Sequence, residues 1–392
     1  MAGALDQHQR VTGALDCLAN STAKMRVGID ASFLLLPNKT GVETYTLNLV
    51  RALLALEDRP ATFLYAAGAS VPPDAVPLFA AADRTRLSRH RREWLRLRLP
   101  ASMFFDRIDV AHFPGTFLPP RLPCPAVSTF YDLAAARYPG LYNPEDLKHY
   151  EYRVPEAARR ARAVLAVSEC TRLDLLEFYS LPAEKVFVTP LGVHPRFAPT
   201  SRAAATVASR FNLLQPYMLA CVGSGHPRKN LRVVFEAFAE LDEPKLLLAV
   251  LGDPQRDAAA YRLLEQMPAR RRVVFLGHVS EEDLPAIYSA ASVFCFPSLY
   301  EGFGLPVLEA MACGAPVVCS NTSSLPEVVG NAALTADPTD PVAFAEALSM
   351  VLTDSDRRKA MSQAGLERAR HFTWERTIRL TVAAYRYATG QV

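Results

Sequence analysis

The sequence predicts an α/β protein built from two doubly wound, Rossmann-like domains in tandem. Short β-rich runs alternate with longer helical stretches, and the runs are continuously apolar. The alternation breaks once near the middle of the chain and then starts again. Continuous apolar strands separated by helices are typical of parallel sheets that helices cover on both faces. The length of 392 residues also favours two cores over one.

The first domain is expected over residues 25–193, where an amphipathic helix at 41–56 follows the first strand. Residues 1–24 are expected to be a flexible extension, because polar and charged residues stand where a signal peptide needs its apolar core. Met25 is the expected start of the folded structure. The expected strands are 25–31, 62–67, 109–113, 126–132, 163–168 and 185–193, with further helical pattern at 144–161 and 169–179.

A stretch rich in proline and small residues, 194–212, has no strand pattern and is predicted to be the domain linker. The second domain is expected over 213–372, and a C-terminal helix within 373–392 is expected to pack back toward the first domain. Since doubly wound sheets bind ligands at the carboxyl ends of their strands, the cleft between the two domains is the expected site. The expected strands of the second domain are 217–223, 246–252, 273–277, 292–298 and 315–320.

Composition excludes several classes of protein. The formal net charge of +3 is small for this length and does not indicate a nucleic-acid partner. No apolar run approaches the roughly 18 residues that a membrane span needs. The seven cysteines are scattered and never form a C-x-x-C pair, which predicts neither a disulfide framework nor a zinc site. A cytoplasmic protein is the expectation.

The run VGSGHPRKN (222–230) joins the first strand of the second domain to its first helix. Gly223 frees the backbone, and Arg228 and Lys229 place two cations beside a helix start, where N–H groups and the helix dipole already favour anions. Arginine and lysine together suit a diphosphate. The alternative is a solvated basic turn, since the run completes neither a G-x-G-x-x-G nor a Walker motif.

The run YEGFGLPVLEAM (300–311) places a tight turn before a helix expected at 305–313. Two carboxylates, Glu301 and Glu309, flank this turn, and glycines at 302 and 304 allow close backbone approach. Either glutamate alone would be interpreted as a helix-dipole partner or a solvated residue. Both together, after a strand, favour a binding site. The residues whose backbone would contact a sugar or phosphate are Gly302, Phe303, Gly304 and Leu305.

With these motifs in view, the chain resembles glycosyltransferase family 4, retaining enzymes of the GT-B fold. The resemblance rests most specifically on Glu301-x7-Glu309, set in PSLYEGFGLPVLEAMACGAPVV, and on PRKN. The segments 41–53, 163–193 and TPLGVHPRFAP (189–199) are also similar, so that the likeness covers roughly residues 25–388.

The resemblance implies a nucleotide-sugar donor held by the second domain and an acceptor held by the first. Arg228 and Lys229 would neutralise the leaving diphosphate, so no metal and no cofactor are expected. Glu309 would accept hydrogen bonds from the ribose hydroxyls, and Glu301 would face the transferred sugar. Gly41 would let the backbone approach the donor phosphate or the acceptor.

The resemblance further implies hexosyl transfer, with GDP-mannose as the first guess for the donor and a glycan or lipid-linked acceptor in polysaccharide or glycoconjugate biosynthesis. Three alternatives stay open: a nucleotide-sugar 2-epimerase of the same fold, a degenerate sugar-nucleotide-binding protein, and a dinucleotide-dependent oxidoreductase. The last is disfavoured because the Rossmann fingerprint is incomplete.

One departure from the family pattern concerns the donor side of the first domain. Family members commonly carry a His-Asp pair where this chain reads Tyr131-Asp132. A tyrosine keeps a hydrogen-bonding tip but cannot become an imidazolium near neutral pH. His112 and His226 are the nearby imidazoles, and each is expected to be structural.

Two further segments need an interpretation. The arginine-rich run 84–100 is predicted either to be a basic amphipathic helix that contacts the inner face of a membrane or to be a helix packed through Trp94 with solvated arginines. The triplet DSD (354–356) matches the Asp-x-Asp metal motif of other glycosyltransferases. Its place before a helical run predicts a helix N-cap instead, and no catalytic metal.

Overall fold

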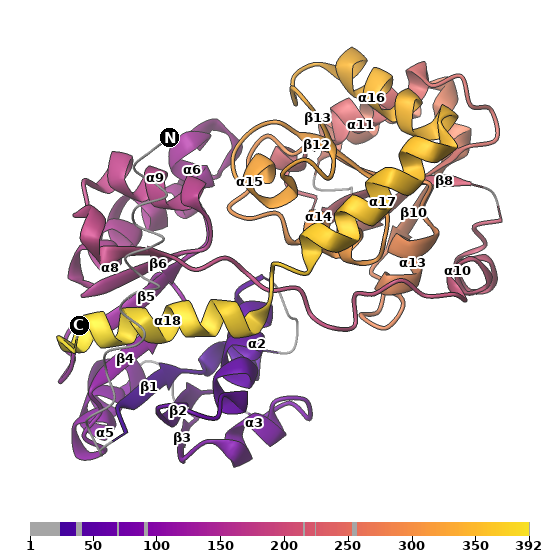
Figure 1. The fold of residues 1–392 in the computed structure, drawn as a ribbon. Coiled ribbons are helices and arrows are strands. Elements are labelled where there is room, and N and C mark those ends of the chain that lie inside the picture. The colour runs from indigo at the N-terminus through magenta and orange to yellow at the C-terminus, as the bar shows by residue number, and fades with distance from the viewer. Residues whose placement is uncertain are drawn as a thin grey trace.

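The computed structural model of the chain describes residues 24–36, 41–68, 70–89, 93–214, 216–223, 225–252 and 257–391. The extension expected at 1–24 falls almost wholly outside these residues. Figure 1 shows two lobes, each built around one sheet, and confirms the predicted pair of doubly wound domains.

The first sheet has seven parallel strands in the order β3-β2-β1-β4-β5-β6-β7. Side chains alternate between its faces, as strand geometry requires. Ile29 and Leu64 pack on the side of α2 and α18, whereas Tyr65 and Ala111 face α5 and α8. The strands are β1 (Arg26–Asp30), β2 (Ala61–Ala67), β3 (Arg84–Ser88), β4 (Val110–Phe113), β5 (Ala126–Phe130), β6 (Ala163–Ala166) and β7 (Val186–Val188).

The helices of the first domain follow the strands in chain order. They are α2 (Gly41–Ala55), α3 (Val76–Ala81), the π-helical turn η2 (Trp94–Arg98), α5 (Leu99–Phe105), α6 (Ala134–Arg137), α7 (Pro144–Lys148), the π-helical turn η4 (His149–Arg153), α8 (Val154–Arg160) and α9 (Glu169–Tyr179).

The second sheet has six parallel strands in the order β10-β9-β8-β11-β12-β13. Its strands are β8 (Tyr217–Gly223), β9 (Leu247–Gly252), β10 (Val273–Gly277), β11 (Val293–Phe296), β12 (Val317–Ser320) and β13 (Leu334–Ala336). Its helices are α10 (Ala203–Phe211), the 3₁₀ turn η6 (Pro227–Lys229), α11 (Leu231–Glu240), α12 (Ala258–Glu265), α13 (Leu284–Ala290), α14 (Leu305–Ala312), α15 (Leu325–Val329), α16 (Pro341–Thr353) and α17 (Ser355–Ala369).

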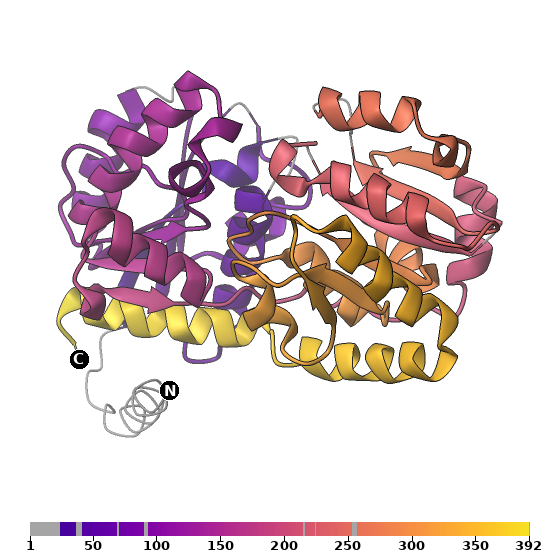
Figure 2. The ribbon, with the colours of Figure 1, turned by 90° about the horizontal axis from the view of Figure 1, so that it is seen from above.

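The last helix, α18 (Trp374–Thr389), leaves the second domain and packs against α2 and β6 of the first. Figures 1 and 2 both show it along the first lobe, while α17 stays on the second. The two segments that connect the lobes are hydrogen-bonded to each other, since the Val193 N–H donates to the Phe372 carbonyl at 3.0 Å. A Cβ at Gly192 would lie 2.2 Å from the Trp374 nitrogen, so this crossing requires glycine.

One expectation about secondary structure is wrong, and one segment contains a helix that was not predicted. Within 84–100, the first residues form the edge strand β3, in which Arg84 and Arg86 both pair with the buried Asp106, and helix begins only at η2. Within the expected linker, Ala203–Phe211 is helix α10 and packs on α13. Small residues in that segment fit against a neighbouring helix.

Candidate active site

The two cations and one of the two glutamates form a single cluster at the carboxyl end of the second sheet. η6 carries Arg228 and Lys229, and the loop after β11 carries Glu301. The Lys229 Nζ lies 2.5 Å and an Arg228 nitrogen 2.9 Å from the same Glu301 oxygen, Oε1. That oxygen also accepts from Ser298 Oγ at 2.6 Å. Ser298 was not predicted as a site residue, although it lies two residues beyond the end of β11 (Val293–Phe296), where site residues of such sheets are expected.

The electrostatics of this cluster keep Glu301 ionised. Glu301 is only 6% exposed, and burial alone would raise the pKa of its carboxyl. Arg228 and Lys229 outweigh burial and hold that pKa at about 2. Burial likewise acts to lower the pKa of Arg228, but the charges of Glu301 and of Asp132, across the cleft, raise it above its ordinary value. The cluster is therefore a charged triad rather than three neutral groups.

Glu309 lies on α14 and faces the neighbouring helix α13, where its carboxylate accepts from Tyr288 Oη at 3.2 Å. Burial raises the pKa of Glu309 to about 8. Its position therefore excludes the interpretation as a solvated helix residue. Glu301 and Glu309 are both close enough to Cys221, at the end of β8, for their charges to act on its thiol. Glu301 lines the cavity between the domains, whereas Glu309 is not among the residues that line it.

The turn before α14 presents backbone rather than side chains. Gly304 caps the helix with φ of 102°, a conformation that favours glycine. The N–H groups of Phe303, Gly304 and Leu305 have no hydrogen-bond partner among the described residues. All three residues line a cavity of about 1410 Å³ between the domains. Unpaired N–H groups at a helix N-terminus are suited to bind phosphate or hydroxyl oxygens.

Gly302 sets the distance between the two domains at this turn. A Cβ on Gly302 would lie 1.7 Å from the Tyr131 carbonyl oxygen of the first domain, so only glycine permits the approach. The Thr171 hydroxyl lies 3.1 Å from that carbonyl and 3.3 Å from the Gly302 carbonyl. The preceding residue, Tyr300, donates its hydroxyl to Asp174 on α9. The loop that holds Glu301 is therefore also a domain contact.

A second contact between the domains lies at the N-terminus of α9. Glu327, on α15 of the second domain, accepts from the backbone N–H groups of Glu169 and Cys170 at 2.9 and 3.0 Å. A carboxylate at this position satisfies helix donors that have no partner within the helix and complements the helix dipole. Sequence reasoning missed Glu327, because its partner lies more than 150 residues away.

The first-domain candidates line the same cavity. Gly41 begins α2 and has nothing within 4 Å of a Cβ position. Asp132 Oδ1 accepts from the Ala134 N–H at 3.1 Å, and Tyr131 donates its hydroxyl to the Pro114 carbonyl at 2.6 Å. This hydrogen bond holds the Tyr131 side chain in position in the wall of the cavity.

The first-domain side of the cavity includes residues that the sequence analysis did not name as site residues. Two π-helical turns, η2 and η4, both contribute to its wall, and π-helical turns are frequent at functional sites. Side chains from these turns and from the loop after β4 gather there, among them Leu95, Arg96, Phe117, His149, Tyr150 and Arg153.

His112 and His226, the two histidines that the sequence analysis considered, both have structural contacts, as expected. His112 is fully buried, its two ring nitrogens lie 2.7 and 2.8 Å from the Tyr385 and Thr129 hydroxyls, and burial lowers its pKa to about 3. It joins β4 to α18. His226 caps η6 by accepting from the Arg228 N–H at 3.2 Å.

The remaining motif, DSD, is an N-cap. Asp354 accepts from the N–H groups of Asp356 and Arg357 at the start of α17. Within the described residues no three His, Cys, Asp or Glu side chains are grouped as a metal site would need. Among the same residues no helix is both long and apolar enough to cross a bilayer.

Comparisons with known proteins agree with this geometry. The family model described as "Glycosyltransferase Family 4" matches residues 39–197, and that described as "Glycosyl transferases group 1" matches 208–368. O-antigen chain mannosyltransferase B of Escherichia coli is 33% identical over 374 residues, which cover 88% of this chain and 96% of the relative. The chain belongs to glycosyltransferase family 4. The protein is thus a glycosyltransferase of glycan biosynthesis.

One further relative and one solved structure are similar to this family 4 glycosyltransferase. The serotype-specific mannosyltransferase WbdA of Escherichia coli is 30% identical over 235 residues, which are 58% of this chain and 29% of the relative. Sucrose-phosphate synthase from Thermosynechococcus elongatus superposes with a TM-score of 0.72 at 22% identity, over 94% of this chain and all of that one. The second likeness shows the GT-B fold alone.

Proposed function

We propose that this glycosyltransferase moves mannose, with retention of configuration, from GDP-mannose to a glycan or lipid-linked acceptor at the inner face of a membrane. The observation that carries the proposal is the pairing of two features at one sheet edge. Two partly buried cations, Arg228 and Lys229, whose side chains are 19% and 12% exposed, stand beside the turn at 302–305 with its unpaired N–H groups. The names of two relatives, both mannosyltransferases, support mannose.

In the proposed reaction the chain's own residues stabilise the leaving diphosphate. Arg228 and Lys229 would shift from Glu301 toward the phosphate oxygens, and the N–H groups of 303–305 would donate to the phosphate or to the transferred sugar. Glu301, already ionised, would then stabilise positive charge near the anomeric carbon. Glu309 would accept from the ribose hydroxyls. No metal is assigned a step.

The acceptor is proposed to enter from the first-domain side of the cavity. The walls there offer aromatic faces and hydrogen-bonding groups from η2, η4 and the loop after β4, which suits a sugar acceptor. Gly41, Tyr131 and Asp132 line the same cavity as the donor turn, and Tyr131 stands where the family commonly has a histidine.

The test is a thermal-shift screen across GDP-, UDP- and dTDP-sugars, followed by transfer from the stabilising donor to glycan acceptors. Preferential stabilisation by GDP-mannose is expected, because a ligand that binds only the folded state raises the melting temperature. NMR of the product should show an α-linkage, matching the donor, and EDTA should leave the rate unchanged. Stabilisation by a UDP-sugar alone, or epimerisation of UDP-N-acetylglucosamine without acceptor, would overturn the proposal.

A further inference from the structure

A tyrosine of the second domain, next to Glu301 in the sequence, reaches into the first domain. Tyr300 is 3% exposed, and its hydroxyl donates to the carboxylate of Asp174 on α9, which is also 3% exposed. The Leu133 N–H lies 3.5 Å from the same hydroxyl oxygen. Burial raises the pKa of Tyr300 above its ordinary value, and the hydrogen bond to Asp174 raises it further, so that the hydroxyl stays a donor. Two buried polar groups from different domains thus satisfy each other.

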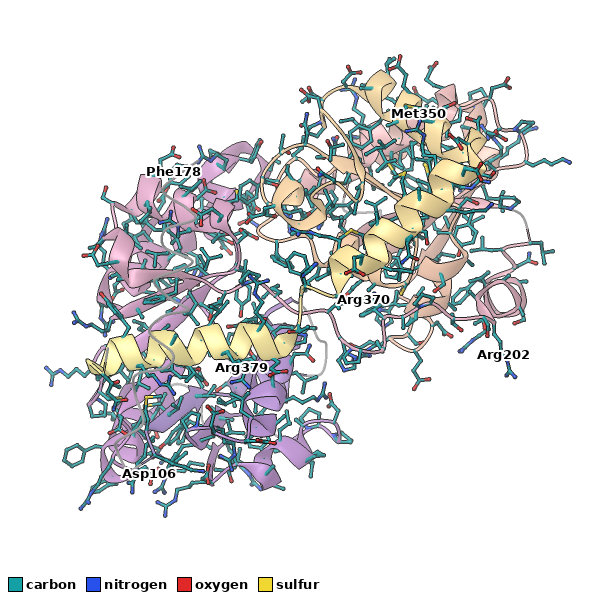
Figure 3. All side chains as sticks on the ribbon, in the orientation of Figure 1. Asp106, Phe178, Arg202, Met350, Arg370 and Arg379 are labelled. Atoms are coloured by element: carbon teal, nitrogen blue, oxygen red, sulfur yellow. The ribbon has the colours of Figure 1, made fainter. Side chains whose placement is uncertain are left out.

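The first domain holds Asp174 from its other side. Arg137, at the end of α6, donates to the second carboxylate oxygen of Asp174 and pairs with Glu177 at 2.6 Å. The Arg137 guanidinium also lies 4.6 Å from the centre of the Phe178 ring, which Figure 3 labels on the first lobe. Because a cation binds one oxygen and Tyr300 binds the other, the Asp174 carboxylate has a defined orientation.

The backbone of Tyr300 holds one end of the Arg228 guanidinium. Arg228 Nη1 donates to the Tyr300 carbonyl at 2.8 Å and lies 2.9 Å from the Glu301 carboxylate. The Arg228 carbonyl in turn accepts from the Leu299 N–H at 2.8 Å and from the Ser298 hydroxyl at 3.1 Å. Among the described residues, Nε and Nη2 of Arg228 make no hydrogen bond. One end of the guanidinium is therefore anchored, and its other edge can donate to two phosphate oxygens.

The first domain also contacts η6 at its N-cap. The Tyr142 ring lies 4.7 Å, centre to centre, from the ring of His226, whose side chain accepts from the Arg228 N–H. This contact acts on the backbone of η6 and is not a hydrogen bond to the guanidinium. The orientation of the Arg228 side chain therefore depends on Glu301 and on the link through Tyr300.

We propose that Asp174 of the first domain is a positioning residue for the diphosphate site of the second, and that it acts through Tyr300 on Arg228. Asp174 fixes the Tyr300 side chain, and the Tyr300 carbonyl fixes Nη1, which leaves the Nε and Nη2 edge for the diphosphate. The carbonyl can keep Nη1 while Glu301 gives way to the phosphate charges. The inference rests on the proposed function, since it requires a diphosphate donor. It adds that the donor site is complete only when the two domains are in contact.

The test is isothermal titration calorimetry of the full chain with GDP, and with UDP and dTDP in parallel. Tyr300→Phe removes only the hydroxyl and should weaken binding of the preferred diphosphate by about tenfold, as the loss of a hydrogen bond to a charged group does. Asp174→Ala should weaken it equally, and the double variant no further, because both residues act through one link. In an Arg228→Ala background, Tyr300→Phe should change the affinity by less than about twofold.

The matched control is Tyr217→Phe, which removes another buried hydroxyl of the second domain, one that donates to the Ile287 carbonyl at 2.6 Å. Tyr217 begins β8, at the opposite end of this strand from Gly223, so this variant should bind the diphosphate like the wild type. All titrations are run well below each melting temperature, which circular dichroism measures.

Three outcomes would overturn the positioning role. They are a Tyr300→Phe variant that binds like the wild type, an equal loss in Tyr217→Phe, and an undiminished effect of Tyr300→Phe in the Arg228→Ala background. If the wild type binds none of the three diphosphates, the proposed function is wrong together with this inference. Wild-type binding that Tyr300→Phe and Asp174→Ala leave unchanged would remove this inference alone.

Discussion

Glu301 is expected to stabilise the fold as well as the site, and Glu301→Gln measures how much. The ordinary pKa of a glutamate is 4.5, and in the folded protein the pKa of Glu301 is held at about 2. Each unit of such a difference corresponds to about 1.4 kcal/mol. The ionised carboxylate therefore stabilises the folded state by ~3 kcal/mol, in the range found when one partner of a buried ion pair is removed.

The sign of the pH dependence follows from the lowered pKa. The stabilisation is fully present above about pH 4.5 and is lost as the pH falls toward 2. Urea unfolding at pH 7 should show the variant less stable by ~3 kcal/mol, with the same deficit at pH 5.5 and a smaller one at pH 3.5. Glu156→Gln, in an exposed pair with Arg160, should change stability by less than about 0.5 kcal/mol. A deficit that stays constant down to pH 3.5 would refute the reasoning.

Three further predictions concern groups at the domain contact and in the proposed donor site. Burial raises the pKa of Glu309 to about 8, so the unfolded protein releases this proton at a lower pH than the folded protein. The free energy of unfolding of the wild type should therefore fall between pH 5 and 9 relative to that of Glu309→Gln. An equal difference between the two proteins at pH 5 and at pH 9, measured by urea unfolding, would contradict this. Glu327→Gln should destabilise the N-terminus of α9 by ~1 kcal/mol and speed the exchange of its amide hydrogens. Unchanged exchange of the Glu169 and Cys170 amides would contradict this prediction. Gly302→Ala should clash with the Tyr131 carbonyl and enlarge the radius of gyration in solution scattering, whereas Gly41→Ala should not.

The general architecture could be predicted from sequence because apolar runs and helical periods are local signals. Eleven strands were expected, and the structure adds β3 and β13, which have weak signals. β3 is an edge strand whose alternate arginines reach Asp106, so its sequence resembles a basic helix until the partner is known. β13 has three residues, too few for any pattern to stand out.

The site could be predicted as a set of residues but not as an arrangement. Glycines and charges after strands indicated Arg228, Lys229 and Glu301, and the topology of parallel sheets brings such strand ends together. Their mutual ion pairing depends on the conformation of two loops, which residue spacing does not determine. The role of Glu327 is still harder to predict from the sequence, because it depends on how the two domains pack against each other.

The loop at 298–304 belongs both to the proposed donor site and to the contact between the domains. Glu301 pairs with both cations, and its neighbours Tyr300 and Gly302 contact Asp174 and the Tyr131 carbonyl of the first domain. A diphosphate that competes for the cations must change the contacts of Glu301, and the change reaches residues one position away on either side. Because these residues form the domain contact, the proposed donor would alter the same interface across which the acceptor arrives. Donor affinity and domain closure should therefore be coupled through this loop, and variants at Tyr300 should change both together.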